Sequence, residues 1–306
     1  MLCMGIDTSN YTTSAALYDT ENGKIINARK LLSVREGELG LRQSDAVFQH
    51  TVNLPLMIKE VFRDGAVKTD VIGVSIRPRD EEGSYMPCFL AGKAVADSIS
   101  SVTGVPVKYF SHQAGHIAAA LYSADALHLK DRDFIAFHVS GGTTEAVLVT
   151  PDKDNVFNTK IVCSSLDLKA GQAVDRTGKL LGLSFPAGKA LDELSLLSDR
   201  QYKIKPCIKD GNCSLSGLQN KCEKMKKDGE SPEDIAKYCI DYISQVLREM
   251  TLTLKENYPG LPFVYSGGVM SNTLIRKRFK EEFGAVFAEP AFSSDNAAGI
   301  AVLASF

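Results

Sequence analysis

The feature that most constrains the fold is a pattern of strand, polar turn and strand at the start of each half of the chain. In the first half it is "MLCMGIDTSNYTTSAALYD", and in the second it is "FIAFHVSGGTTEAVLVTPD". An apolar run, a polar turn and a second apolar run together favour a hairpin. Helical periodicity follows in both halves, so the sequence predicts two α/β units with a related pattern.

The segments after the first hairpin alternate between helix and strand. "DAVFQHTVNLPLMIKEVFRDG" has apolar residues at three- and four-residue spacing, and "PCFLAGKAVADSISSVTG" reads as a helix that ends in glycine. "VIGVSI" and "VPVKYF" are predicted strands. The polar segment "DALHLKDRD" suits a linker, so we predict lobes at 1–130 and 131–306, and the C-terminal helix could still pack back on the first lobe.

Composition excludes several classes of protein. With 44% hydrophobic and 24% charged residues among 306, the chain is typical of a soluble globular protein, and a net charge of -2 gives no global basic field for nucleic acid. The start lacks signal-peptide features, and no apolar run reaches the roughly 20 residues of a membrane span, so we expect a cytoplasmic protein without membrane contact. Seven cysteines without a C-x-x-C pair indicate reduced thiols.

Two histidines, His112 and His116, stand four residues apart in "SHQAGHIAAA", where a polar turn runs into an alanine-rich segment. Helix positions four apart share a face, so two imidazoles at this spacing can bind one cation. Zinc proteases use the same spacing with a glutamate base between the histidines, and this chain has no glutamate there. The pair alone leaves two interpretations open, a metal site and an ordinary helix start.

Two Ser-Gly-Gly turns follow predicted strands. One is Ser140 to Gly142, and the other lies in "FVYSGGVMSNTLIRKRFKEEFG". Backbone amides that glycine leaves accessible at a helix N-terminus form an anion site. The two turns favour phosphate contacts on a nucleotide, although Gly-Gly after a strand is also a common tight turn.

From Met4 to the C-terminus, the sequence resembles the TsaD/Gcp family of threonylcarbamoyladenosine synthases, once filed as M22 metallopeptidases. The resemblance rests on seven segments in one order: "GIDTSNYTTSAALYD", "SHQAGHIAAAL", "HVSGGTTEAVLV", "AGQAVDRTGKLLGLSFPAG", "CSLSGLQ", "YSGGVMSNTLIRKRF" and "SSDNAAGIA". It implies the α/β fold shared by actin, sugar kinases and Hsp70. In that fold two ribonuclease-H-like lobes close over a central nucleotide and metal cleft.

The resemblance also implies site residues. His112, His116 and Asp295 would hold one divalent metal, iron(II) or zinc, because two imidazoles and a carboxylate suit these ions. Asp175 would accept from ribose hydroxyls, whereas Asn272 could equally cap a helix. The implied contacts to an ATP- or AMP-type nucleotide are His138, Val139, Ser140, Gly141, Gly142, Asp175, Gly188 and Asn272.

The implied reaction transfers a threonylcarbamoyl group from threonylcarbamoyl-AMP to N6 of the tRNA adenosine next to the anticodon, and AMP leaves. No covalent nucleophile is required, so none is assigned. The implied partners are tRNA, TsaB-like and TsaE-like proteins, or a second copy bound through the first lobe.

The chain departs from the family pattern in four places. Tyr11 and Thr12 replace an Asp-Glu pair, Thr143 replaces a histidine, Gln172 replaces a glutamate, and "RPRDEEGSYM" replaces a glycine-rich turn. These changes indicate a divergent member. Two alternatives remain, a paralogue that transfers a carbamoyl group to another acceptor and a non-catalytic nucleotide-binding partner of the synthase. The histidine pair disfavours the second, and the missing glutamate base disfavours the old peptidase label.

Overall fold

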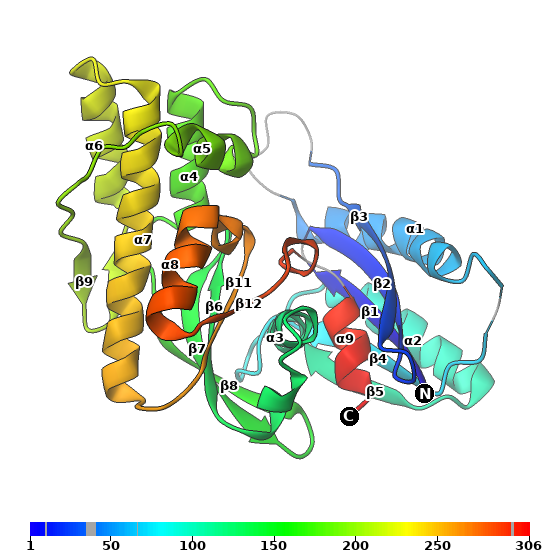
Figure 1. Ribbon diagram of the computed structural model, residues 1–306. Helices are drawn as coiled ribbons and strands as arrows, with labels where there is room; N and C mark the ends of the chain where they lie inside the picture. The colour runs from blue at the N-terminus through cyan, green and yellow to red at the C-terminus, as the bar shows by residue number, and fades with distance from the viewer. Residues whose placement is uncertain (10, 35–40, 66, 295–296) are drawn as a thin grey trace. The chain divides into compact units, whose positions relative to one another are not determined.

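The computed structural model describes residues 1–9, 11–34, 41–65, 67–294 and 297–306. The chain divides into two compact α/β units, which are considered separately (Figure 1). Unit 1 consists of Met1–Asp131, Pro151–Thr159 and Ala291–Phe306, and unit 2 of Arg132–Thr150 and Lys160–Pro290. The lobe boundaries at 1–130 and 131–306 remain a prediction. In the structure, two short segments from later in the chain also belong to unit 1.

Unit 1 contains a mixed sheet with the strand order β3-β2-β1-β4-β5. The predicted hairpin is present, because β1 and β2 pair antiparallel with Asp7 opposite Ser14. Strand β3 extends the antiparallel part, while β4 and β5 add parallel strands on the other side of β1. The strands are β1 (Leu2–Ser9), β2 (Thr12–Asp19), β3 (Lys24–Leu31), β4 (Val71–Arg77) and β5 (Val107–Ser111).

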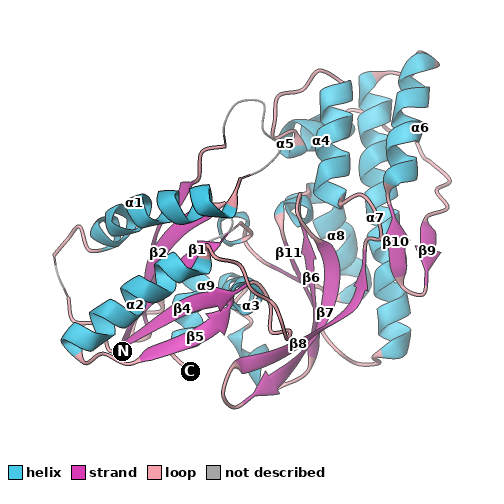
Figure 2. Ribbon diagram, turned by 180° about the vertical axis from the view of Figure 1, so that it is seen from behind, coloured by secondary structure: helices cyan, strands magenta, loops and turns pink. Residues whose placement is uncertain are grey.

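Helices cover both faces of this sheet (Figures 1 and 2). Alternate residues of a strand point to opposite faces, and the two faces of β1 show this directly. Ile6 and Thr8 lie against Gly92 of α2, whereas Gly5 faces α9, where an added Cβ would come within 2.6 Å of the Ala301 nitrogen. The helices are α1 (Gln43–Val61) and α2 (Phe89–Thr103) on one face, and α3 (His112–Ser123) and α9 (Ala298–Ala304) on the other; the short helix η1 (Leu127–Asp131) follows α3.

Unit 2 is built around a second sheet with the same topology. Its order β8-β7-β6-β11-β12 matches β3-β2-β1-β4-β5 strand for strand. Strands β6 and β7 form the predicted antiparallel hairpin, and β11 pairs parallel with β6 as β4 does with β1. The duplicated pattern is therefore confirmed at the level of topology. The strands are β6 (Phe134–Val139), β7 (Thr144–Asp152), β8 (Val156–Ser164), β11 (Phe263–Ser266) and β12 (Val286–Phe287).

Aromatic and aliphatic side chains of this second sheet pack against long helices. Tyr265 of β11 is fully buried, stacks on Phe137 and Phe287, and shares a 2.7 Å hydrogen bond between its hydroxyl and Thr251 Oγ1 of α7. Burial raises the pKa of this phenol well above its usual value. The remaining elements are α4 (Ala170–Leu180), α5 (Gly188–Ser195), β9 (Cys207–Lys209), β10 (Asn212–Ser214), α6 (Ser216–Lys227), α7 (Pro232–Asn257), η2 (Gly268–Ser271), α8 (Thr273–Phe283) and η3 (Pro290–Phe292).

The seven cysteines all lie in the described ranges, and each is a free cysteine there. Among the helices described, none is both long enough and apolar enough to cross a membrane.

Candidate functional site

Two turns of unit 2 lie side by side because their strands are parallel neighbours. Strands β6 and β11 pair in register with His138 opposite Ser266, and His138 Nδ1 lies 3.1 Å from Ser266 Oγ. Gly267 adopts a φ of 95°, and an added Cβ would lie 2.3 Å from the Val139 carbonyl oxygen. Only glycine fits such an approach at this φ. The Ser-Gly-Gly turns therefore meet at the carboxyl edge of the sheet.

The N-terminus of α4 packs on the first of these turns. Gly171 N donates to the Ser140 carbonyl at 3.1 Å, and Ala170 N donates to Thr144 Oγ1 at 2.8 Å. An added Cβ on Gly171 would come within 2.4 Å of the Gly141 nitrogen, so the backbones are in direct contact. The missing side chain at Gly171 thus sets how close α4 comes to the turn.

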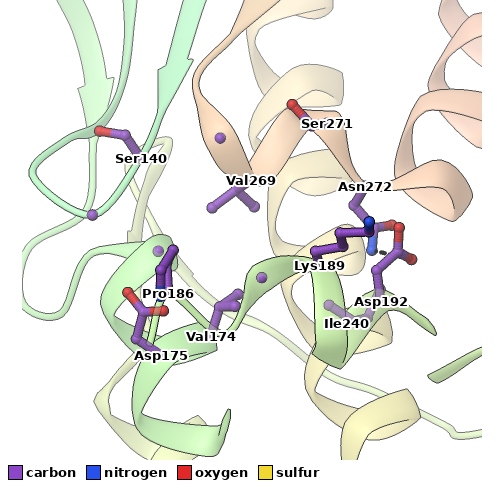
Figure 3. Close-up of a pocket in the computed structure, with 14 residues that line it drawn as sticks. Ser140, Val174, Asp175, Pro186, Lys189, Asp192, Ile240, Val269, Ser271 and Asn272 are labelled. Atoms are coloured by element: carbon purple, nitrogen blue, oxygen red, sulfur yellow. Dashed lines mark hydrogen bonds between the residues drawn. The ribbon is translucent and has the colours of Figure 1, made fainter. Parts of the chain in front are cut away.

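These elements enclose a pocket of about 510 Å³ within unit 2. Figure 3 shows its walls, with the 140–141 turn, the start of α4, α5 and the η2 segment around one space. Nearby Gly141 and Gly142 are both exposed, and no atom lies within 4 Å of where a Cβ would stand on either. The lining residues are Ser140, Gly141, Gly171, Val174, Asp175, Pro186, Gly188, Lys189, Asp192, Ile240, Gly268, Val269, Ser271 and Asn272.

The structure brings five of the eight predicted nucleotide contacts together in this pocket. They are Ser140, Gly141, Asp175, Gly188 and Asn272. The other three, His138, Val139 and Gly142, adjoin the same turn but are not among its lining residues.

Two predicted residues also have structural roles. Asp175 Oδ1 accepts from Ala187 N at 2.9 Å, which fixes the loop that leads into α5. Asn272 is the N-cap of α8, where its Oδ1 accepts from Ile275 N at 3.0 Å, so the capping interpretation holds alongside the lining position. Each side chain therefore shapes the pocket wall as well as facing the space.

Sequence reasoning missed Asp192 of α5, which ties two walls of the pocket together. Its carboxylate accepts from Asn272 Nδ2 at 2.7 Å and from Thr273 N at 3.1 Å. A signal was present, because Asp192 stands four residues after Gly188 and so shares its helix face. Lys189 also lines the pocket, with a largely exposed side chain.

The histidine pair lies in unit 1 at the start of α3. Ser111 is the N-cap, since its Oγ accepts from Ala114 N at 3.1 Å, and His112 and His116 follow on one face. Their Nε2 atoms are 3.0 Å apart, so both rings direct the same nitrogen toward one point. Two nitrogens bound about 2.0–2.1 Å from one tetrahedral zinc ion would be about 3.3–3.4 Å apart, a spacing close to that of the two Nε2 atoms, so the donor set suits a metal.

The third predicted ligand, Asp295, lies outside the described residues. Among the residues that are described, no group of three or more histidine, cysteine or acidic side chains could hold a metal ion. The structure therefore brings together two of the three predicted ligands.

The "RPRDEEGSYM" segment, which replaces a glycine-rich turn, supports this helix start. Arg77 Nη2 pairs with Asp80 Oδ1 at 2.7 Å, and Asp80 Oδ2 accepts from Ser111 Oγ at 2.6 Å. Gln113 N donates to the Pro78 carbonyl at 3.0 Å. The acidic and basic side chains of the segment thus hold the N-cap that precedes the histidines.

Another departure, Thr143, closes the turn of unit 2 through its backbone. Thr143 N donates to Ser140 Oγ at 3.2 Å, and its carbonyl accepts from Ser140 N at 2.7 Å. A turn held in this way does not need a histidine side chain to keep its shape.

Comparison with known proteins decides the family. Residues 25–302 match the sequence model described as TsaD, tRNA N6-adenosine threonylcarbamoyltransferase. The chain belongs to the TsaD family. Proteins named tRNA N6-adenosine threonylcarbamoyltransferase are similar over nearly the full length. The Persephonella marina protein is 28% identical over 292 residues, covering 92% of this chain and 81% of that one, and the Thermosipho africanus protein is 28% identical over 320 residues, covering 99% and 93%.

Solved structures show the same fold at low sequence identity. Full-length HypF, in a phosphate- and nucleotide-bound form, aligns with a TM-score of 0.58 and 14% identity over 98% of this chain, which spans 54% of HypF. A ROK family glucokinase from Streptomyces griseus aligns with a TM-score of 0.54 and 12% identity, covering 100% of this chain and 98% of that one. The TsaD family member therefore has the two-lobe α/β fold of the sugar-kinase type, as predicted.

Proposed function

We propose that this protein transfers a threonylcarbamoyl group from threonylcarbamoyl-AMP to N6 of the tRNA adenosine next to the anticodon. Family membership over residues 25–302 and relatives with that name support the reaction class. The observation that carries the proposal is the unit 2 pocket, in which five residues expected at a nucleotide site line one space.

In this proposal the pocket binds the adenylate part of the substrate. The accessible backbone at Gly141 offers amide donors to a phosphate. Asp175 accepts from ribose hydroxyls, because a carboxylate that already takes one backbone N–H retains further acceptor positions. Lys189 adds a positive charge at the rim and balances the anionic ligand.

The proposed metal is iron(II) or zinc, held by His112, His116 and Asp295. A bound ion of this kind supplies Lewis-acid stabilisation of developing negative charge on an acyl oxygen. The fit rests on the two Nε2 atoms 3.0 Å apart, since the geometry of Asp295 lies outside the described residues.

The chemical step needs no covalent intermediate with the protein. The N6 amine attacks the carbonyl carbon of the mixed anhydride and forms a C–N bond. The bond from that carbon to the phosphate oxygen breaks, AMP leaves with the electron pair, and the amine proton passes to solvent. Turn amides near Ser140 and Gly141 would stabilise the departing phosphate.

We propose tRNA as the acceptor and the cytoplasm as the location of the protein. We also propose a protein partner that binds unit 1. Phe48, Val52 and Leu56 recur at four-residue spacing on α1 and are 70%, 53% and 51% exposed. Such an apolar stripe suits a TsaB-like protein or a second copy of this chain. A TsaE-like protein remains part of the proposal from the family alone.

One observation favours a second candidate, carbamoyl transfer to another acceptor. The 77–86 segment is held by charged side chains through Arg77 and Asp80, where the family has a glycine-rich turn. A changed surface at this place would suit a different acceptor.

Calorimetric titration with AMP tests the pocket, and a transfer assay with threonylcarbamoyl-AMP labelled in its threonine part tests the reaction. Asp175→Asn should weaken AMP binding about 10-fold or more, because a charge-assisted hydrogen bond contributes roughly 1.5–3 kcal/mol. Asp199→Asn, an exposed acid elsewhere in unit 2, is the control and should bind AMP like the wild type. AMP binding without transfer to tRNA would favour the second acceptor, whereas no AMP binding would overturn the proposal.

A further inference from the structure

The imidazole of His112 is held on the side opposite the proposed metal. Its Nδ1 lies 3.0 Å from Oδ1 of Asp7, a fully buried residue of β1. Ser75 Oγ of the neighbouring strand β4 donates to the same Asp7 oxygen at 2.5 Å. Three elements of unit 1, β1, β4 and α3, thus meet at one carboxylate oxygen.

This contact selects the protonation form of the ring. An ionised carboxylate only accepts hydrogen bonds, so with Asp7 in its ionised form His112 Nδ1 carries the proton in this contact. In the neutral imidazole the other nitrogen, Nε2, is then unprotonated, so it can accept a hydrogen bond or bind a metal ion. His112 Nε2 is the atom that lies 3.0 Å from His116 Nε2.

Asp7 is also well placed to hold the ring still. Strand β1 pairs with β2 on one side and with β4 on the other, and Asp7 has no exposed surface. Its Ser75 partner is equally buried. A carboxylate fixed on a central strand leaves the imidazole little freedom to rotate, which lowers the entropic cost of binding a ligand to Nε2.

We propose that Asp7 is a positioning residue for the metal, one that fixes the tautomer and the orientation of His112. The proposal rests on the metal site of the proposed function. Partners that accept from the outer N–H of a ligating histidine typically contribute 10- to 100-fold to metal affinity. Asp7 is a sequence neighbour of neither histidine, so its role follows from the fold and not from the H-x-x-x-H spacing.

The test is zinc affinity of the metal-free full chain, measured by competition with a chromophoric chelator at one fixed pH. Asp7→Asn should bind zinc 10- to 100-fold more weakly than the wild type. Asp70→Asn is the matched control, because Asp70 also bonds within unit 1, accepting from Leu2 N at 2.7 Å, but does not touch the histidines. Asp7→Asn with wild-type affinity would overturn the proposal.

A second readout separates positioning from a general loss of structure. With ¹⁵N-labelled histidine, long-range proton–nitrogen NMR of the metal-free wild type should show His112 protonated on Nδ1. Asp7→Asn should shift this signal toward the Nε2-protonated form, while Asp70→Asn should not. If neither the wild type nor His112→Ala/His116→Ala binds zinc, the metal site of the proposed function fails. In that case the NMR signal alone decides whether Asp7 sets the tautomer.

Discussion

The carboxyl ends of β4 and β11 occupy matching positions in two sheets of the same topology, yet they are used differently. Strand β11 runs into Gly267 and Gly268, whose backbone lies against the next strand and beside the pocket. Strand β4 runs into Arg77 and Pro78, whose polar groups are taken by Asp80 and by the start of α3. The turn after β11 leaves Gly268 exposed beside the pocket, whereas in the turn after β4 the Pro78 carbonyl accepts a hydrogen bond from Gln113 N of α3.

This difference shows how one topology supports two kinds of site. The pocket of unit 2 depends on residues without side chains, because Gly171 and Gly267 let backbones approach each other. The histidine pair of unit 1 depends on side chains held by other side chains, through Asp7 and through Ser111 with Asp80. Substitutions should therefore act through steric exclusion in unit 2 and through lost hydrogen bonds in unit 1.

The largest expected effect is that of Gly267→Ala. The new Cβ would stand 2.3 Å from the Val139 carbonyl at a φ of 95°, so both clash and backbone strain act against the native turn. We expect the free energy of unfolding to fall by about 3 kcal/mol, measured by urea denaturation. Gly268→Ala is the control, since no atom lies within 4 Å of its Cβ position. Equal losses in both variants would show that close approach does not define this turn.

An intermediate effect is expected from Ser111→Ala, compared with Ser231→Ala. Both serines are helix N-caps, and removing a cap costs about 1 kcal/mol. Ser111 is buried and also donates to Asp80 at 2.6 Å, so its loss leaves a partly buried carboxylate with one partner fewer. We expect about 2 kcal/mol for Ser111→Ala and about 1 kcal/mol for Ser231→Ala. If Ser111→Ala lowers the free energy of unfolding by less than Ser231→Ala does, unit 1 does not rely on linked side chains in this way.

The smallest expected effect concerns pH and His50 of α1, a buried ring bonded to Thr13 Oγ1 at 2.8 Å. Burial lowers the pKa of His50 below its usual value of 6.5. As pH falls through 6.5, His50 takes up a proton in the unfolded chain before it does so in the folded one. The free energy of unfolding should therefore decrease as pH falls from 7 toward 5. In His50→Gln this decrease should be smaller, as urea denaturation at the two pH values would show. If His50→Gln and the wild type show the same dependence of stability on pH, His50 does not contribute to that dependence.

Much of the fold was predictable because periodicity reports burial directly. The hairpins at Asp7 and Ser140 and the helix that ends before Gly104 follow the sequence pattern. The pairing of β6 with β11 was not predictable from pattern, since more than a hundred residues separate them and register comes from tertiary packing.

The candidate site was predictable where a motif gives residues in local order. Ser140, Asp175 and Asn272 line one pocket as members of separate motifs. Asp192 and Asp7 were missed as supporting residues because their partners, Asn272 and His112, are about 80 or more positions away. Sequence spacing reports neighbours on one helix, whereas such long-range hydrogen bonds exist only once the fold brings the elements together.

The position of α9 bears on how the protein is made. This helix, Ala298–Ala304, is buried and lies against Gly5 of β1 and Gly73 of β4. A ribosome that makes the chain in order completes every residue of unit 2 before it makes α9. Domains that fold during synthesis usually do so from the N-terminus. Here the first unit to emerge must wait with the part of its sheet around Gly5 and Gly73 uncovered, so nascent chains are more exposed to aggregation and to chaperones until α9 leaves the exit tunnel.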